Sequence, residues 1–120
     1  MGHQDCAVLV VEDDPELRQM MVVMLALEGF EPQSATDGLD ALERLRTADS
    51  RPRLILLDMM MPRMDGWEFC RQQALDPGLC SIPVIVLSAA PRDRVNVDAA
   101  AFLSKPFDYD SLLRTIRQHC

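Results

Sequence analysis

The sequence predicts an α/β fold, in which a five-stranded parallel sheet is covered by helices on both faces. Short apolar runs alternate with amphipathic stretches along the 120 residues, which is typical of repeated strand–helix units. The first run, Cys6 to Val11, is apolar at nearly every position, as expected for a strand buried on both faces of a parallel sheet. We see no linker or repeat, so we expect residues 1–120 to form a single domain.

Local signals mark the elements that follow the first strand. Asp14 is suited to cap a helix that has Pro15 at its first position, and Gly29 can end that helix in the left-handed conformation. The next strand, residues 30–35, contains Pro32, which cannot donate a hydrogen bond to a neighbouring strand. We therefore expect this second strand at an edge of the sheet.

The remaining elements follow the same alternation. Either Thr36 or Asp37 caps the second helix, and Asp108 caps the last one. The other predicted segments are a third strand at 54–57, a helix at about 65–75, a fourth strand at 82–87 and a short fifth strand at 100–104.

Composition and charge exclude several classes of function. The formal net charge is −7 and no block of basic residues occurs, which argues against direct nucleic-acid binding. No apolar run approaches the roughly 18 residues of a membrane span, and the first residues show no signal-peptide pattern. The spacing of the four cysteines does not suggest a zinc site, so we expect four free thiols in a reducing cytoplasm.

Carboxylates follow two of the predicted strands. Glu12, Asp13 and Asp14 come directly after the first strand, and Asp58 comes after the third. Ligands of open α/β sheets gather at this edge, where several carboxylates would repel one another unless a hard divalent cation joined them. Lys105 follows the fifth strand and could enter the same crevice. The pattern indicates a metal-assisted phosphoryl site.

Four motifs occur in order along the chain, namely Leu9 to Arg18, Leu57 to Gly66, Pro83 to Ala89 and Phe102 to Phe107. Together they resemble the motifs of bacterial response-regulator receiver domains of the chemotaxis-regulator type. The resemblance implies a flavodoxin-like fold with strand order 2-1-3-4-5, an order for which a member of this family is already the standard example.

The resemblance also assigns roles to the acidic residues. It implies that Asp58 is the phosphoacceptor, whose carboxylate attacks a phosphoryl group and forms an acyl phosphate. Asp13, Glu12, Asp58 and the backbone carbonyl of Met60 would hold Mg²⁺, which prefers octahedral oxygen ligands. Asp14 falls one position later and is interpreted mainly as the helix cap.

Four further residues match positions of the receiver pattern. Lys105 would pair with the phosphoryl oxygens, and a cis peptide bond would join it to Pro106. Ser88 could donate its hydroxyl to a phosphoryl oxygen, and Phe102 matches the aromatic switch position. An ordinary strand-end serine and a simple core aromatic remain open alternatives for these two residues.

The interval between Ser88 and Lys105 departs from the family pattern. It is too short for the usual full helix, and Pro91, Asn96 and Asp98 do not favour a long one. We therefore expect a fourth helix that is short, irregular or mobile, which leaves the family's usual output surface in doubt.

The resemblance implies a cytoplasmic, non-enzymatic phosphoacceptor that receives its phosphoryl group from a sensor histidine kinase or a phosphotransfer protein and acts on an unknown output partner. Three alternatives remain. An aspartyl-phosphate hydrolase would need a second acid where Met60 stands, and a flavin carrier would need a hydroxyl-rich loop in place of the acids after the first strand. A receiver-like scaffold that works without phosphorylation is the third.

Overall fold

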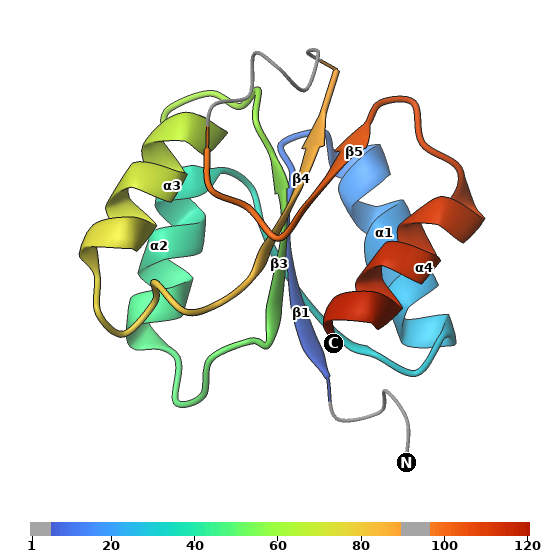
Figure 1. Ribbon diagram of the computed structural model, residues 1–120, viewed down its shortest axis with the longest axis horizontal. Helices are drawn as coiled ribbons and strands as arrows, with labels where there is room; N and C mark the ends of the chain where they lie inside the picture. The colour runs from blue at the N-terminus through green and yellow to red at the C-terminus, as the bar shows by residue number, and fades with distance from the viewer. Residues whose placement is uncertain (1–5, 90–96) are drawn as a thin grey trace.

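Five parallel strands form the central sheet in the order β2-β1-β3-β4-β5 (Figure 1). The structure is a computed structural model that describes residues 6–89 and 97–120. Its elements in chain order are β1 (Ala7–Val11), α1 (Pro15–Leu27), β2 (Glu31–Ala35), α2 (Gly38–Thr47), β3 (Leu54–Asp58), α3 (Gly66–Leu75), β4 (Val84–Ser88), β5 (Ala101–Ser104) and α4 (Tyr109–His119). The predicted fold class and strand order are therefore confirmed.

Two hydrophobic clusters lie on opposite faces of the sheet. Helices α2 and α3 cover one face, and α1 and α4 cover the other (Figure 1). Successive residues of a strand point to opposite faces, so Leu9 and Ile55 join the first cluster while Val8 and Leu56 join the second. Because both faces are covered, β3 is buried along its whole length, Asp58 included.

The predicted caps of the first two helices and the edge position of the second strand are confirmed. Asp14 caps α1 by accepting hydrogen bonds from the backbone N–H groups of the first turn, with Pro15 at the start of the helix. Of the two candidates for the second cap, Asp37 is the one used. Gly29 has φ 91° after α1, and β2 lies at a sheet edge as Pro32 requires.

The fourth strand begins later than the sequence predicted. We expected it to start at Ile82, but β4 runs from Val84 to Ser88. The N–H of Ile82 donates to the carbonyl of Leu79 at 3.1 Å, so the preceding turn holds this residue outside the ladder. The predicted fourth helix falls mostly on residues 90–96, which lie outside the described part of the chain. Residues 97–100, which follow, are not helical.

The prediction of four free thiols is wrong. Cys6 and Cys120 form a disulfide, with their Cα atoms 6.0 Å apart, whereas Cys70 and Cys80 are free. The cause is topological. The last turn of α4 points toward the end of the sheet at which β1 begins (Figure 1). Spacing along the sequence carries no sign of this meeting. Among the described helices, none is long and apolar enough to cross a membrane.

Candidate functional site

Three carboxylates converge beyond the C-terminal ends of two adjacent strands. Glu12 and Asp13 follow β1, Asp58 ends β3, and the register pairs Val11 with Leu57, so the two strand ends lie side by side. One carboxylate oxygen from each of the three acids lies within 4.8 Å of the others. Asp14 turns away to cap α1. This all-oxygen set fits a hard divalent cation such as Mg²⁺.

Asp58 is a buried carboxylate at the centre of the site. Its side chain is almost fully enclosed, and Oδ1 accepts a 3.3 Å hydrogen bond from the backbone N–H of Met60. The same oxygen lies 3.3 Å from Nζ of Lys105. A buried carboxylate held between a peptide N–H and an ammonium group has a fixed direction, which is what a nucleophile needs.

Glu12 is the most enclosed of the three acids, at 1% exposure. Its Oε1 lies 3.3 Å from Nζ of Lys105, and its Oε2 accepts a 3.2 Å hydrogen bond from the N–H of Asp14. Burial, together with the negative charge of Asp58, raises the pKa of Glu12 from 4.5 to about 7, although the hydrogen bond from Asp14 and the charge of Lys105 oppose this rise. Burial is the main cause of this rise and the neighbouring Asp58 charge adds to it, so a cation bound between the two carboxylates would favour the charged form of Glu12.

Lys105 supplies the positive charge of the site. Its backbone N–H donates to the carbonyl of Ser88 at 2.8 Å, which ties the end of β5 to the end of β4, and the Lys105–Pro106 peptide bond is cis as predicted. Burial lowers the pKa of Lys105, but the charges of Asp58 and Glu12 outweigh that effect and leave the pKa raised above 10.5. Lys105 is the only lysine in the chain.

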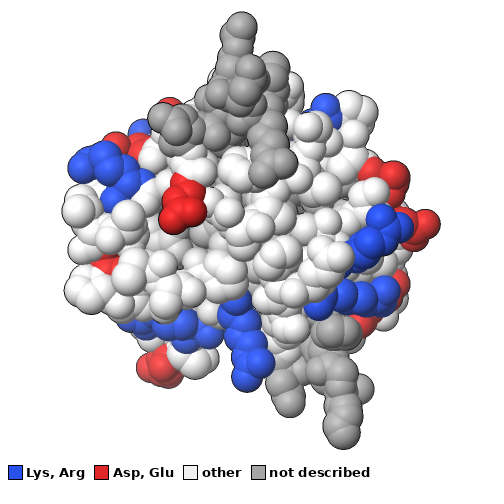
Figure 2. All heavy atoms as spheres, in the orientation of Figure 1, with Lys and Arg blue, Asp and Glu red and all other residues white. Residues whose placement is uncertain are grey.

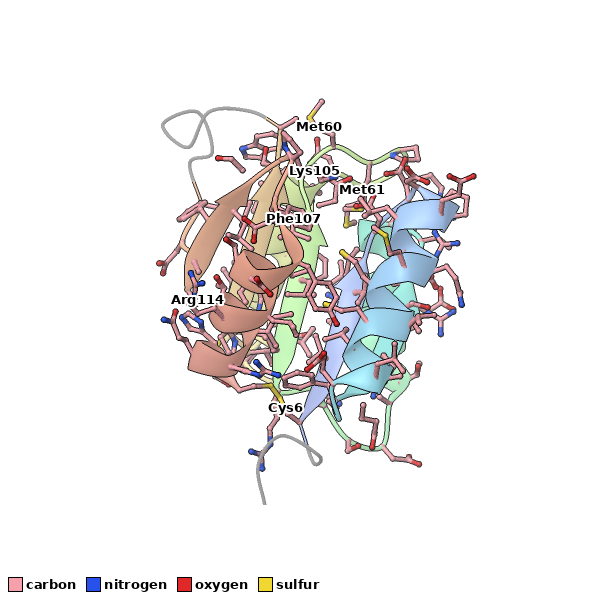
Figure 3. The ribbon with its side chains drawn as sticks, turned by 90° about the vertical axis from the view of Figure 1, so that its right-hand side faces the viewer. Cys6, Met60, Met61, Lys105, Phe107 and Arg114 are labelled. Atoms are coloured by element: carbon pink, nitrogen blue, oxygen red, sulfur yellow. A yellow bond between two sulfur atoms is a disulfide. The ribbon has the colours of Figure 1, made fainter. Side chains whose placement is uncertain are left out.

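The two predicted switch residues lie on neighbouring strands. Ser88 ends β4 as a buried residue, one position beyond Leu87, which pairs with Asp58 in the register. Phe102 lies on β5, where it pairs with Val86 of β4. Its side chain is partly buried and packs against the hydrophobic cluster under α2 and α3. The side chain of Met60 is 63% exposed, and Figure 3 shows it at the same end of the sheet as Lys105.

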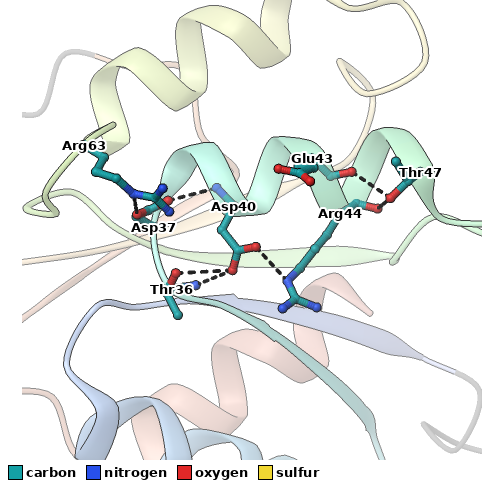
Figure 4. Close-up of polar contacts among 7 residues, drawn as sticks. All are labelled: Thr36, Asp37, Asp40, Glu43, Arg44, Thr47 and Arg63. Carbon is teal, nitrogen blue, oxygen red and sulfur yellow. Dashed lines mark hydrogen bonds and ion pairs between the residues drawn. The ribbon is translucent and has the colours of Figure 1, made fainter.

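The sequence analysis missed a contact that holds the loop after β3. Nε of Arg63 lies 2.6 Å from Oδ2 of the buried Asp37 (Figure 4). The N–H of Gly38 donates to the carbonyl of Met64 at 3.1 Å. The loop that follows Asp58 is thereby anchored to the start of α2. Asp37 was recognised only as a helix cap, because nothing local to residues 37 and 63 predicts that they meet.

Glycine at position 66 lets the same loop turn closely over the end of β3. A Cβ atom there would collide with the sulfur of Met59 and would lie 2.7 Å from the Cα of Met59. The N–H of Gly66 donates to the carbonyl of Met59 at 2.9 Å, so the start of α3 lies directly against the residue that follows β3. The glycine therefore helps to place the loop of Met60 over the carboxylates.

A family model for the response regulator receiver domain matches residues 8–117 of the chain. The response regulator MprA of Mycobacterium sp. (strain KMS) is 39% identical over 117 residues, which cover 92% of this chain and 48% of that protein. The chain thus spans about half the length of the curated relatives it matches.

Solved structures share the fold closely. The chemotaxis response regulator CheY4 of Vibrio cholerae has a TM-score of 0.86 and 30% identity, over 96% of this chain and 98% of that one. The response regulator TrrA of Thermotoga maritima, solved in complex with Mg²⁺ and BeF, has a TM-score of 0.84 and 25% identity, over 97% of this chain and 100% of that one.

Proposed function

Since the chain belongs to the response-regulator receiver family, we propose that it is a phosphoacceptor of a two-component phosphorelay and that Asp58 carries the phosphoryl group. One observation carries the proposal. A buried aspartate at a strand end has an ammonium group 3.3 Å from its Oδ1, and it shares with Glu12 and Asp13 a cluster of oxygens within 4.8 Å. We propose that residues 1–120 form the single receiver domain that accepts the phosphoryl group.

In this proposal a carboxylate oxygen of Asp58 attacks phosphorus. The new O–P bond forms as the P–N bond of a phosphohistidine donor breaks, and the donor's imidazole keeps the electron pair. Phosphoryl transfer requires mainly positioning and charge neutralisation, which the fixed carboxylate and Lys105 provide. Glu12, Asp13 and the backbone carbonyl of Met60 would hold Mg²⁺, which neutralises charge on the transferred oxygens when bound. The protein is a signalling domain that assists its own phosphorylation and dephosphorylation.

The switch in this proposal runs from Asp58 through Ser88 to Phe102. A phosphoryl group adds acceptor oxygens near the buried end of β4, and the Ser88 hydroxyl can donate to one of them. Movement of Ser88 would change the packing space beside Phe102. The change is a shift between two populations, and its size is limited by the new contacts.

The partner that delivers the phosphoryl group is, in this proposal, a sensor histidine kinase or a phosphotransfer protein. Helix α1 starts directly after the acidic residues and exposes Met20, Val23 and Leu27, which lie at helical spacing along one stripe. An exposed apolar stripe beside a reactive site is suited to receive a helix of the donor. In this proposal the relay operates in the cytoplasm, where a sensor kinase would deliver the phosphoryl group.

Phosphoramidate with Mg²⁺ tests the assignment without a kinase. We expect intact mass spectrometry to find one added phosphoryl group on the wild type and none on Asp58→Asn. The matched control is Asp49→Asn, an exposed aspartate in the loop before β3, at the opposite end of that strand. Equal labelling of the wild type and Asp58→Asn would refute the proposal, as would loss of labelling in the control.

A further inference from the structure

The end of the sheet opposite Asp58 carries chemistry that phosphoryl transfer does not use. The Cys6–Cys120 disulfide lies there, joining the start of β1 to the end of α4 (Figure 3). A cleft of about 400 Å³ opens beside it, lined by Arg51, Arg53, His119 and Cys120 among others. That volume lies within the range of small-molecule sites.

The two sulfur atoms differ in access. Cys6 is buried at 3% exposure and does not line the cleft, whereas Cys120 is half-buried and does. Thiol–disulfide exchange depends on which sulfur an incoming thiolate can reach. A reagent in the cleft therefore meets Cys120, and Cys6 is the leaving group.

The lining of the cleft is basic although the chain as a whole is acidic. Arg51 and Arg53 are exposed, and neither guanidinium forms an ion pair with a carboxylate in the described part of the chain. The backbone N–H of Arg53 donates to the carbonyl of Ala7 at 2.8 Å, which ties the backbone of this arginine to the residue that follows Cys6. Figure 2 shows basic side chains gathered along the lower rim of the face that it displays.

His119 also lines the cleft. Its Nδ1 donates to the carbonyl of Thr115 at 2.9 Å, which holds the ring next to Cys120. No carboxylate side chain lines the cleft among the described residues. This lining suits an anionic ligand, which would lie against Cys120.

We propose that this cleft is a thiol-exchange site at which an anionic low-molecular-weight thiol, of the glutathione type, opens and re-forms the Cys6–Cys120 disulfide. Disulfides in reducing compartments are usually transient and redox-sensing, so a disulfide in a phosphorelay receiver calls for a route by which it is opened. The site lies at the other end of the sheet from the acidic residues, and the need for a route that opens the bridge rests on the proposed function in a cytoplasmic phosphorelay.

The exchange requires only the low-molecular-weight thiol and water. The thiol loses its proton to water, and its thiolate forms a bond to Sγ of Cys120. The Cys6–Cys120 bond breaks, its electron pair moves to Sγ of Cys6, and this buried sulfur takes a proton from water. A second thiol then attacks the mixed disulfide, which frees Cys120 and releases the oxidised low-molecular-weight disulfide. The reverse sequence, driven by that disulfide as oxidant, closes the bridge again.

The test measures how fast two thiols open the bridge in the whole, oxidised chain. Reduced glutathione and 2-mercaptoethanol, which has no charged group besides its thiolate, are compared at equal thiolate concentration, with acid quenching, alkylation and peptide mapping. The variant Cys70→Ser/Cys80→Ser removes the background of the free thiols. We expect a mixed disulfide on Cys120 and a free thiol on Cys6.

The matched variant is Arg51→Gln/Arg53→Gln, whose side chains are exposed and whose loss should leave the fold intact. We expect it to slow glutathione by about threefold to tenfold, the size of two exposed charge interactions, and to slow 2-mercaptoethanol clearly less, because its thiolate carries no charge beyond that of the sulfur. In Cys6→Ser, oxidised glutathione should modify Cys120 and show the same dependence on the two arginines.

Several results would overturn the proposal. A mixed disulfide on Cys6 would show that the reagent does not enter through the cleft. Equal slowing of both thiols in the arginine variant would show that charge does not select the reagent. Cys6 and Cys120 remaining unlinked after oxidation would remove the site altogether. The rate comparison uses proteins that keep Cys6. It therefore still tests the proposal if Cys6→Ser does not fold.

Discussion

Lys105 and Asp58 face each other across the ends of non-adjacent strands, with Nζ of the lysine 3.3 Å from Oδ1 of the aspartate. Strand β4 separates β3 from β5 in the sheet, so only a long side chain from beyond β5 can reach the acid. The same ammonium group lies 3.3 Å from Oε1 of Glu12. Lys105 thus competes with any cation for the two buried carboxylates, and it would assist a phosphoryl group once one is attached.

Lys105→Met should change metal binding and phosphorylation in opposite directions. Removing the ammonium group leaves the carboxylates more negative, so Mg²⁺ should bind more tightly by calorimetry. Phosphorylation by phosphoramidate should slow by at least about tenfold, because the developing charge on the transferred oxygens loses a partner. Arg114→Met, an exposed cation on α4, is the control and should change neither quantity. Weaker Mg²⁺ binding in Lys105→Met would contradict this account of the charges.

Two neighbouring acids provide a matched test of the metal ligands. Asp13→Asn should weaken Mg²⁺ binding by about tenfold or more, since a ligand carboxylate is lost. Asp14→Asn should bind Mg²⁺ nearly as the wild type does, because asparagine caps a helix as well as aspartate. Calorimetry on the two variants decides the matter. Equal losses would mean that general charge, and not ligation by Asp13, governs affinity.

An added methyl group should destabilise the fold more at Gly66, in the loop after β3, than at Gly78, in a distant turn. Gly66→Ala should lower the free energy of unfolding by about 1 to 3 kcal/mol, because its Cβ would press on the strand backbone. Gly78→Ala meets only ordinary contacts, the nearest at 3.4 Å, and should be neutral within about 0.5 kcal/mol or slightly stabilising. Urea denaturation of both variants measures the difference, and similar losses would show that close approach is not the cause.

The disulfide should stabilise the fold strongly, because it spans a sequence separation of 114 residues. Closing a loop of that length removes about 4 to 5 kcal/mol of conformational freedom from the unfolded chain in the chain-entropy description. Reduction of the wild type should therefore lower its melting temperature, whereas a reductant should have no effect on Cys6→Ser. An unchanged melting temperature on reduction of the wild type would argue against the bridge.

The switch should depend on the hydroxyl of Ser88. With beryllofluoride and Mg²⁺ as a phosphoryl mimic, we expect backbone NMR shifts to change around Ser88 and Phe102 in the wild type. Ser88→Ala should still bind the mimic but should lose most of the change at Phe102. The control variant Ser88→Thr keeps a hydroxyl at this position and should retain the response. An undiminished change at Phe102 in Ser88→Ala would show that the two residues are not coupled.

What could be predicted from the sequence was local or followed from fold topology. The caps at Asp14 and Asp108, the left-handed Gly29 and the edge position of β2 depend on residues close together in the chain, and each is confirmed. The meeting of Asp58 with Glu12 and Asp13 follows from parallel strands, whose carboxyl ends share one edge of the sheet.

What was missed depends on packing between distant segments. The Arg63–Asp37 ion pair and the Cys6–Cys120 disulfide each join residues whose local sequence carries no sign of the other. The position of a helix end relative to a strand start is set by how the helices lie on the sheet. Periodicity and capping signals report which residues are helical, but they do not report where the last turn of a helix comes to rest.

The most direct test of the central claim is to find the phosphorylated atom itself. After treatment with phosphoramidate and Mg²⁺, borohydride reduces an acyl phosphate to an alcohol and leaves an unmodified carboxylate intact, so peptide mass spectrometry can locate the reacted residue. We predict homoserine at position 58, dependent on Mg²⁺, and unaltered acids at Glu12, Asp13 and Asp14. Homoserine at another acid, with Asp58 intact, would contradict the account.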